Sequence, residues 1–169
     1  DIAGVCTRLF SNPDALASWA NLVKGQCVAS SYTKMVGELA NTSAGRSWTW
    51  QTCTEFGYYQ TGQDATQPFS SRINLAWFER ICTDVFGVTP EEISNSVDQT
   101  NKYYGAASFA GNATVFNNGD VDPWHVLSVL TPKPGQYEAH LIHGTAHCAD
   151  LYAASPFDSQ ELRDARKAT

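Results

Sequence analysis

The sequence predicts an α/β fold in which a mostly helical part, residues 1–110, precedes a shorter part with two strands, residues 111–169. Two observations lead to this prediction. In the first part, apolar side chains recur every three or four residues between capping residues, which is typical of amphipathic helices. In the second part, two short apolar and β-branched runs each end in a loop with glycine, which is typical of strands.

The first two predicted helices span residues 12–24 and 31–40. The first run begins with Asn12 as a capping residue and Pro13 at the first helical position, where the missing N–H of proline costs nothing. The second has similar apolar spacing, and the polar residues that follow it, including glycine, predict a loop.

Two further helices are predicted from residue 73 onward. Residues 73–86 are apolar at helical spacing and precede Gly87, a residue suited to the left-handed conformation that ends many helices. Thr89, Pro90 and Glu92 then form the pattern of a capping box, in which the threonine and the glutamate each accept a backbone hydrogen bond.

Residues 46–60 separate these pairs of helices and are rich in aromatic and β-branched side chains. Trp48 and Trp50 alternate with polar residues at the start of this segment. Such composition favours extended backbone. We therefore expect a buried, extended crossing segment.

The second part contains two predicted strands, residues 113–117 and 138–143, and a final helix. Asp158 is expected to cap that helix, which then runs for about three turns of ~3.6 residues before the printed sequence stops. This ending suggests a truncated or disordered helix.

The charge of the chain argues against nucleic acid as a partner. Its 169 residues include 11 lysines and arginines and carry a net charge of -6, whereas phosphate binding requires a basic face. No stretch reaches the roughly 20 consecutive apolar residues that a membrane span requires.

Five cysteines without a C-x-x-C pair favour disulfides over zinc or redox motifs. The candidates are Cys6, Cys27, Cys53 and Cys82. Because the number is odd, at least one cysteine is free or pairs outside this chain. Two glycosylation sequons, at Asn41 and Asn112, agree with an oxidising compartment.

Each predicted strand leads into a loop with one titratable residue, Asp122 after the first and His147 after the second. Ligands and catalytic groups gather at such strand ends in open α/β sheets. A carboxylate can orient an imidazole that takes a proton from a serine hydroxyl. Asp120 is the local alternative for the acid, and we expect it to be a solvated turn residue.

The motifs around these two residues, N-G-D-V-D-P-W and G-T-A-H-C-A-D-L, together with R-S-W-T-W-Q-T-C-T-E-F-G-Y-Y-Q-T upstream, resemble the serine carboxypeptidase family that includes Pro-X carboxypeptidase, dipeptidyl peptidase II and thymus-specific serine protease. The resemblance covers roughly residues 48–166 and is strongest to the thymus-specific branch. It implies that residues 111–169 are the C-terminal part of an α/β-hydrolase domain. Residues 1–110 would then be the later part of a helical cap domain.

The resemblance further implies a serine-type peptidase that acts near proline, with Asp122 and His147 as catalytic residues and no cofactor. No G-x-S-x-G nucleophile motif occurs in the sequence, so the serine would lie upstream, and this chain alone would be inactive. Expected partners are peptide substrates and that upstream portion, and a homo-oligomer is left open. The expected location is outside the cell or in the lysosomal lumen. The alternative is a non-catalytic structural or assembly protein of the same fold.

Four other residues are candidates for substrate binding: Trp48, Trp50, Glu55 and Trp124. Aromatic rings suit a prolyl ring but equally suit a core. Glu55 could bind a substrate group or form a structural salt bridge, and the salt bridge is the favoured interpretation.

A metal site is the third functional alternative. His140, His143 and His147 with Asp150 have a ligand-like composition. Residues three apart on a strand point to opposite faces, so we predict no metal.

Overall fold

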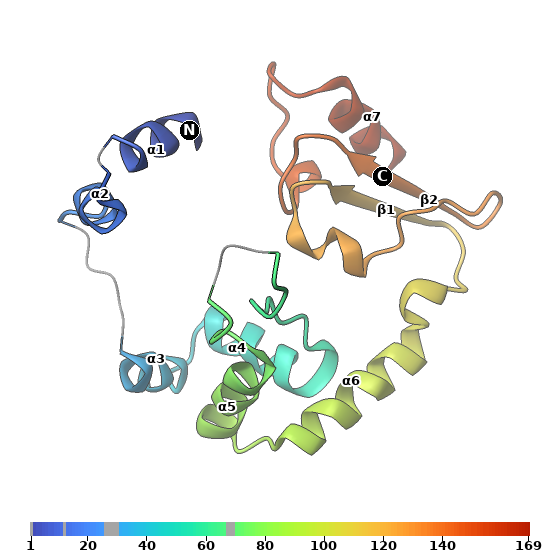
Figure 1. The fold of residues 1–169 in the computed structure, drawn as a ribbon. Coiled ribbons are helices and arrows are strands. Elements are labelled where there is room, and N and C mark those ends of the chain that lie inside the picture. The colour runs from blue at the N-terminus through green and yellow to red at the C-terminus, as the bar shows by residue number, and fades with distance from the viewer. Residues whose placement is uncertain (1, 12, 26–30, 67–69) are drawn as a thin grey trace. The chain divides into compact units, whose positions relative to one another are not determined.

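The computed structural model describes residues 2–11, 13–25, 31–66 and 70–169 (Figure 1). The chain divides into two compact units, Asp1–Glu38 and Leu39–Thr169.

The first unit contains α1 (Ile2–Leu9), α2 (Ala15–Leu22) and most of α3 (Tyr32–Leu39), and α1 contacts α2. The helix predicted from residue 12 is present, but its predicted start is wrong. Asp14 caps α2, because its carboxylate accepts hydrogen bonds from the backbone N–H groups of Leu16 and Ala17 at 3.0 and 3.1 Å. Pro13 therefore precedes the cap, and Asn12 lies outside the described residues.

The second unit begins at the end of α3, which confirms the helix predicted over residues 31–40. Asn41, the first sequon, is exposed in the bend that follows. Ser43 ends this bend and caps α4 (Ala44–Gln51), since its Oγ accepts the N–H of Arg46 at 3.1 Å.

The prediction of an extended segment at residues 46–60 is wrong, because residues 44–56 are helical. A π-helix, η1 (Thr52–Phe56), continues α4. The hydroxyl groups of Thr49 and Thr54 donate to carbonyl oxygens one turn earlier, both at 2.8 Å, so these β-branched residues are accommodated within the helix. Local capping and tertiary packing outweigh the strand preference of the composition.

The core of the helical region forms where η1, α5 (Leu75–Phe86) and α6 (Pro90–Tyr104) meet. Cys53 and Cys82 form a disulfide there and are buried with Ile93. The disulfide prediction is thus confirmed for these two cysteines. Cys6 is exposed with a free thiol, and Cys27 lies outside the described residues.

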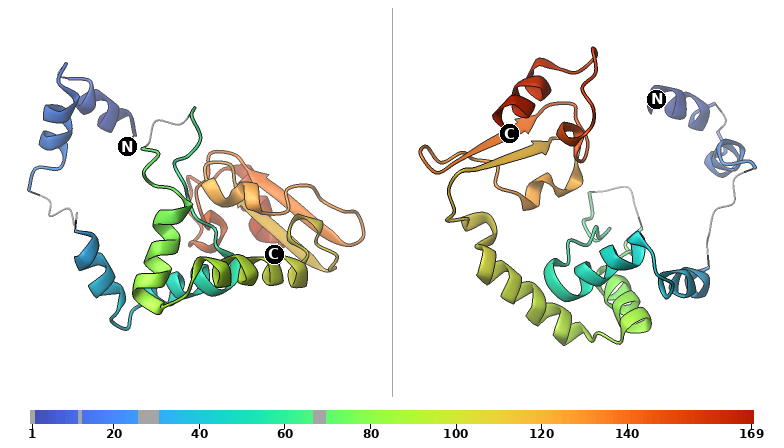
Figure 2. Two further views of the ribbon diagram at one scale, coloured as in Figure 1. Left: turned by 60° about the horizontal axis from the view of Figure 1, so that its bottom comes forward. Right: turned by 180° about the vertical axis from the view of Figure 1, so that it is seen from behind.

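The caps predicted for α5 and α6 are confirmed. Gly87 ends α5 in the left-handed conformation at a φ of 74°. Thr89 and Glu92 form the capping box of α6, with the Thr89 N–H donating to Glu92 at 2.8 Å. In Figures 1 and 2, α6 leads from the helical group through η2 (Ala106–Ser108) to the strands.

The strands β1 (Thr114–Gly119) and β2 (Tyr137–Ile142) pair in parallel, with Thr114 opposite Tyr137 and Gly119 opposite Ile142. Both predicted strands are therefore confirmed, with shifted ends. Since the strands run in the same direction and in register, their carboxyl ends meet at one edge.

Three helical elements surround this pair: η3 (Pro123–Leu127), η4 (Ala149–Leu151) and α7 (Gln160–Ala168). Ile142 on β2 is buried with Leu162 and Ala165 of α7. The predicted cap of α7 is wrong, because Ser159 accepts the N–H of Leu162 and caps the helix instead of Asp158. None of the described helices is long and apolar enough to cross a membrane.

We predict that the disulfide stabilises the helical core strongly. The double variant Cys53→Ala, Cys82→Ala lacks this cross-link, so its unfolded chain has a higher conformational entropy. The free energy of unfolding should therefore fall by about 3 kcal/mol. Denaturant unfolding of the full-length protein measures this change. Cys6→Ser is the matched control and should unfold like the wild type, because its thiol is exposed and free. Equal unfolding midpoints for the double variant and the wild type would contradict the prediction.

Candidate active site

The loops that follow β1 and β2 are bonded directly to each other. The N–H of Asp120 donates to Ile142 O at 3.2 Å, and the N–H of Val121 donates to Thr145 O at 3.1 Å. A carboxylate oxygen of Asp120 also accepts the N–H of Gly144 at 2.7 Å. These three bonds make the two loops one rigid block.

Gly119 permits this close contact. A Cβ atom at this position would lie 2.2 Å from the carbonyl oxygen of Thr145 and 2.7 Å from its carbonyl carbon. Backbone atoms cannot give way as the end of a flexible side chain can. Only glycine therefore fits at position 119 without a clash with the backbone of Thr145.

Asp122 and His147 face each other across the joined loops. Asp122 caps η3, with Oδ1 accepting the N–H of Trp124 at 2.9 Å, and its Oδ2 lies 2.6 Å from His147 Nδ1. The Asp122 side chain is only 8% exposed, whereas that of His147 is 57% exposed. The pair predicted from sequence is thus brought together, with the acid buried and the imidazole accessible.

The pKa of Asp122 determines which atoms of the Asp122–His147 pair carry protons. Burial raises the pKa of the Asp122 carboxyl, but the hydrogen bonds from His147 and from the Trp124 N–H outweigh burial and lower this pKa below its usual value. Asp122 is therefore ionised at neutral pH and can only accept. His147 Nδ1 must donate, which leaves the lone pair of neutral histidine on Nε2.

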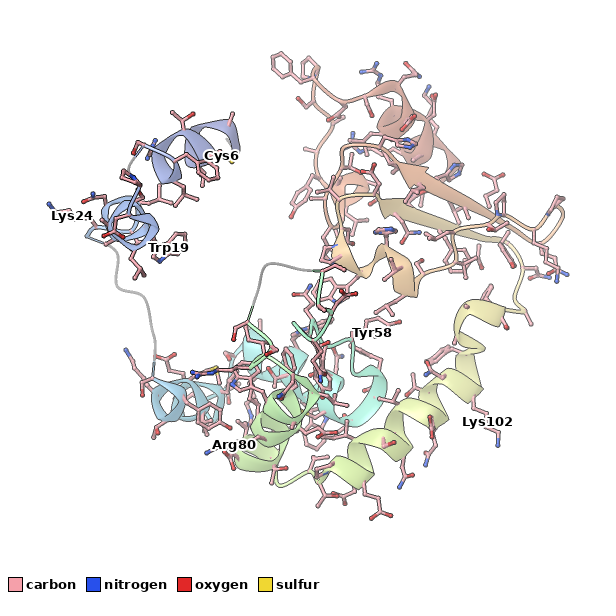
Figure 3. All side chains as sticks on the ribbon, viewed as in Figure 1. Cys6, Trp19, Lys24, Tyr58, Arg80 and Lys102 are labelled. Atoms are coloured by element: carbon pink, nitrogen blue, oxygen red, sulfur yellow. A yellow bond between two sulfur atoms is a disulfide. The ribbon has the colours of Figure 1, made fainter. Side chains whose placement is uncertain are left out.

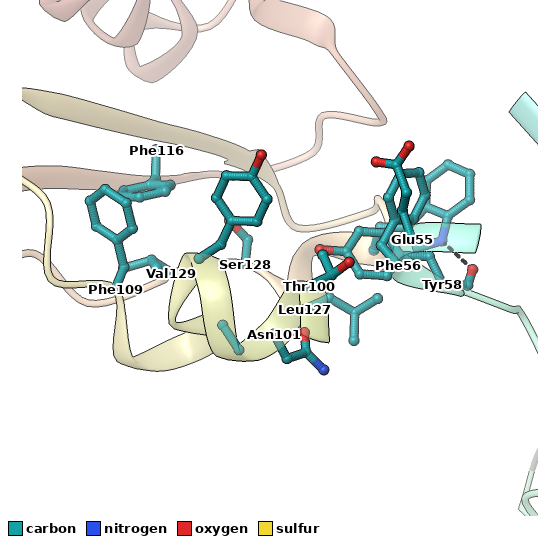
Figure 4. A pocket seen from close by; sticks show the side chains of 13 residues that line it. Glu55, Phe56, Tyr58, Thr100, Asn101, Phe109, Phe116, Leu127, Ser128 and Val129 are labelled. Atoms are coloured by element: carbon teal, nitrogen blue, oxygen red, sulfur yellow. Dashed lines mark hydrogen bonds between the residues drawn. The ribbon is translucent and has the colours of Figure 1, made fainter. Parts of the chain in front are cut away.

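Trp124 forms one wall beside the imidazole. Its ring centroid lies 4.9 Å from that of His147 and 5.9 Å from that of Trp48. The indole Nε1 donates to the carbonyl oxygen of Tyr58 at 3.0 Å, the dashed line in Figure 4. Tyr58 is labelled in Figure 3, and its bond to Trp124 joins the helical region to the strands within the second unit.

Helix α7 braces the loop that carries His147. The guanidinium of Arg166 donates to Ala149 O at 2.9 Å and to Asp150 O at 3.1 Å, and it pairs with the carboxylate of Asp158. Asn117 on β1 donates to the Asp150 carboxylate at 3.1 Å. The turn after His147 is thus held from two sides.

The histidines that suggested a metal site lie beside different carboxylates. His140 Nε2 lies 3.3 Å from Glu138, and His143 Nδ1 lies 3.1 Å from Glu161. Within the described ranges, no group of three or more histidine, cysteine, aspartate or glutamate side chains could hold a metal ion.

The four candidate substrate-binding residues lie in different places. Trp124 and Glu55 line a cavity of about 530 Å³, shown in Figure 4. Trp48 contacts Trp124. Trp50 packs on Phe86 of α5 with ring centroids 5.2 Å apart, and it lines neither this cavity nor the hollow that holds His147.

Sequence reasoning missed three residues that support the pair. Gly119 and Arg166 received no role, and Asp120 was expected to be a solvated turn residue. Asp120 does lie in a turn, but it is half-buried, and its carboxylate accepts the N–H of Gly144 and so connects the loops. The glycine at the end of a strand, in the run Gly119-Asp120, is the signal that could have indicated a close backbone approach.

The sequence matches the family described as serine carboxypeptidase S28 over residues 10–169. The chain belongs to the serine carboxypeptidase S28 family. The resemblance inferred from the motifs is therefore confirmed. Membership implies an α/β-hydrolase fold, and the small parallel sheet with its helices is consistent with part of such a domain.

Several relatives are similar to the chain. A serine protease of Caenorhabditis elegans is 43% identical over 129 residues, which are 72% of this chain and 25% of that protein. Thymus-specific serine protease of Mus musculus is 39% identical over 148 residues, which are 84% of this chain and 29% of that protein. An extracellular serine carboxypeptidase of Arthroderma benhamiae is 41% identical over 88 residues, or 50% of this chain and 12% of that protein.

The chain thus spans less than a third of the length of these S28 relatives. No solved structure matches it.

We predict that Gly119→Ala disrupts the joined loops. The added Cβ displaces the backbone of Thr145 and should lower the free energy of unfolding by about 2 kcal/mol or more. Denaturant unfolding checks this change. The control is Gly37→Ala in α3, where a Cβ meets nothing within 4 Å and replaces a helical glycine, so stability should be equal or slightly higher. An equal change in the free energy of unfolding for both variants would show that Gly119 is not tightly packed against Thr145.

We also predict a pH-dependent contribution from Asp158. The N–H of Ser155 and the guanidinium of Arg166 lower the pKa of this carboxyl. The stability that ionised Asp158 contributes is therefore full above the ordinary aspartate pKa of about 3.9 and is lost as the pH falls through the lowered pKa. Asp158→Asn should be less stable than the wild type at pH 7, and the difference should shrink in strong acid. A difference independent of pH in unfolding titrations would argue against this assignment.

Proposed function

We propose that the protein is a serine peptidase in which His147 is the general base and acid and Asp122 orients it. The observation that supports this proposal most directly is the 2.6 Å contact between Nδ1 of the 57% exposed His147 side chain and a buried carboxylate. The similarity to proteins named serine proteases favours a peptidase over a non-catalytic relative.

The proposed reaction uses the two nitrogens of His147 differently. Nε2 takes the proton of a serine hydroxyl while the serine oxygen attacks the peptide carbonyl carbon. The imidazolium that forms is stabilised by Asp122 through Nδ1. The same proton then moves to the leaving amine, and water hydrolyses the acyl-enzyme by the equivalent route.

The nucleophile and the oxyanion hole would come from a part of the protein outside residues 1–169. The sequence has no G-x-S-x-G motif, and the relatives are more than three times as long as the matched region. Exposed apolar side chains beside the loops, Leu151 and Tyr152, are suited to contact with such a part. By this proposal residues 1–169 alone are inactive.

The proposed domain assignment follows the same logic. Residues 1–110 would be the later part of a helical cap, and residues 111–169 would close the hydrolase domain. The accessible face of Trp124, with Trp48 beside it, would receive a prolyl ring near the scissile bond, because flat apolar rings stack well on indole.

We further propose that the protein is located outside the cell or in the lysosomal lumen. The Cys53–Cys82 disulfide suits an oxidising compartment, and one relative is named an extracellular carboxypeptidase. Asn41 and Asn112, both exposed, would carry glycans there.

A fluorophosphonate probe tests the proposed mechanism in the full-length protein. The wild type should be labelled, and His147→Ala should abolish labelling because no base remains to activate the serine. Asp122→Asn should slow labelling by about 10³-fold or more, since it allows the wrong tautomer of the imidazole.

His143→Ala is the control for this experiment. It removes an exposed imidazole but keeps the backbone N–H that donates to Glu161, so labelling should continue. Undiminished labelling of His147→Ala, or an unlabelled wild type, would refute the proposal.

A further inference from the structure

The backbone turns sharply at Cys148, the residue directly after His147. Cys148 has a φ of 58°, in the left-handed region that residues with a side chain rarely adopt. Its carbonyl oxygen accepts the N–H of Leu151 at 3.0 Å, so the chain winds into η4 immediately after this residue. A left-handed conformation of this kind is strained, and it persists only where the surrounding structure holds it.

The guanidinium of Arg166 makes contacts that hold this turn. It donates to two successive carbonyl oxygens, Ala149 O at 2.9 Å and Asp150 O at 3.1 Å. Two donors in one rigid plane fix the directions of both carbonyl groups, whereas the ammonium group of a lysine is a single point of charge. Because Ala149 directly follows Cys148, these bonds restrict the course of the chain on one side of the strained residue.

Arg166 is itself held in place. Its side chain is 18% exposed and pairs with Asp158, whose side chain is 13% exposed, so neither side chain has much freedom. Helix α7, which carries Arg166, contacts β2 and η4 (Figure 1). Leu162 and Ala165 of this helix are part of a buried cluster with β2. Helix α7 thus connects the sheet to the turn after His147.

The position of the imidazole depends on this turn. More than half of the His147 side chain is exposed, at 57%, so few neighbouring atoms hold the ring. Asp122 contacts Nδ1, Trp124 lies on one side, and the backbone of residue 147 determines the rest. If Cys148 relaxed to a negative φ while Ala149 stayed anchored, His147 would shift. A displacement of about 1 Å can slow a reaction by about 10²-fold.

We propose that Arg166 is a positioning residue, which holds Cys148 in the left-handed conformation and thereby keeps the imidazole of His147 against Asp122. This inference rests on the proposed peptidase function and adds a residue to its catalytic arrangement. Arg166 contacts none of the reacting atoms and acts through the backbone of residues 148–150. The conformation at position 148 matters for this role, and the thiol does not.

The rate of fluorophosphonate labelling of the full-length protein tests this assignment. Its dependence on probe concentration gives a maximal rate and a half-saturating concentration, and the final extent of labelling gives the active fraction. Arg166→Lys keeps a positive charge near Asp158 but loses the planar pair of donors. It should lower the maximal rate by about 10- to 100-fold and leave the half-saturating concentration within about twofold, because the imidazole moves and the probe-binding surface does not. A residue that only stabilised the fold would lower the final extent and not the rate.

Substitutions of Cys148 test the conformational part of the proposal. Glycine adopts a positive φ readily, whereas β-branched valine does not. Cys148→Val should therefore be labelled about 10-fold more slowly than Cys148→Gly. In the Arg166→Lys background, Cys148→Gly should raise the maximal rate by about threefold or more, because a larger fraction of the molecules has the competent turn.

Arg163→Lys is the matched control. Arg163 lies on the same helix but donates to the carbonyl oxygen of Asp158 and to Gln160, at the start of α7. Its replacement should leave the maximal rate within about twofold, since the turn after His147 keeps its contacts with Arg166.

The labelling data separate the two kinds of failure. An unlabelled wild type refutes the peptidase proposal itself. If the wild type is labelled, an Arg166→Lys variant with the wild-type maximal rate, or with a loss confined to the final extent, overturns the role of Arg166. A double variant with Cys148→Gly that is labelled no faster than Arg166→Lys alone overturns the link through the left-handed residue.

Discussion

The close contact of Gly119 with the backbone of Thr145 is the constraint on which the candidate site depends. Parallel pairing in register brings the ends of β1 and β2 to one edge, but pairing alone leaves the following loops free to diverge. The close approach of Gly119 to the Thr145 backbone, together with the hydrogen bonds of Asp120 and Val121, holds the two loops against each other. The 2.6 Å contact between Asp122 and His147 follows from this rigid block.

Burial then gives the two side chains different properties. Asp122 is enclosed by its own capping turn and by His147, so it is an ionised acceptor that cannot exchange partners easily. His147 is held at Nδ1, and 57% of its side chain is exposed. A buried, ionised acceptor and an exposed imidazole thus arise from the same local fold in this member of the S28 family.

The sequence predicted those features that depend on local chemistry. Caps at Gly87 and at Thr89 with Glu92, both strands and the proximity of Asp122 and His147 could be inferred because short motifs determine them. Residues 46–60 could not, because aromatic composition favours strand while the Ser43 cap, the threonine hydroxyls and the packing around Cys53 favour helix. The role of Asp120 depends on Gly144, 24 residues away, and that of Arg166 on Asp150 and Ala149, 16 and 17 residues away. A single sequence does not reveal such distant pairs.

The bond from Trp124 to Tyr58 has a consequence for evolution of the site. Since one indole borders both the imidazole and the cavity of Glu55, its replacement would alter the surroundings of the base and the shape of the cavity together. Trp124 is therefore more constrained than cavity residues that lie away from His147, such as Glu55 and Thr100, and these can be replaced without changing the surroundings of the imidazole.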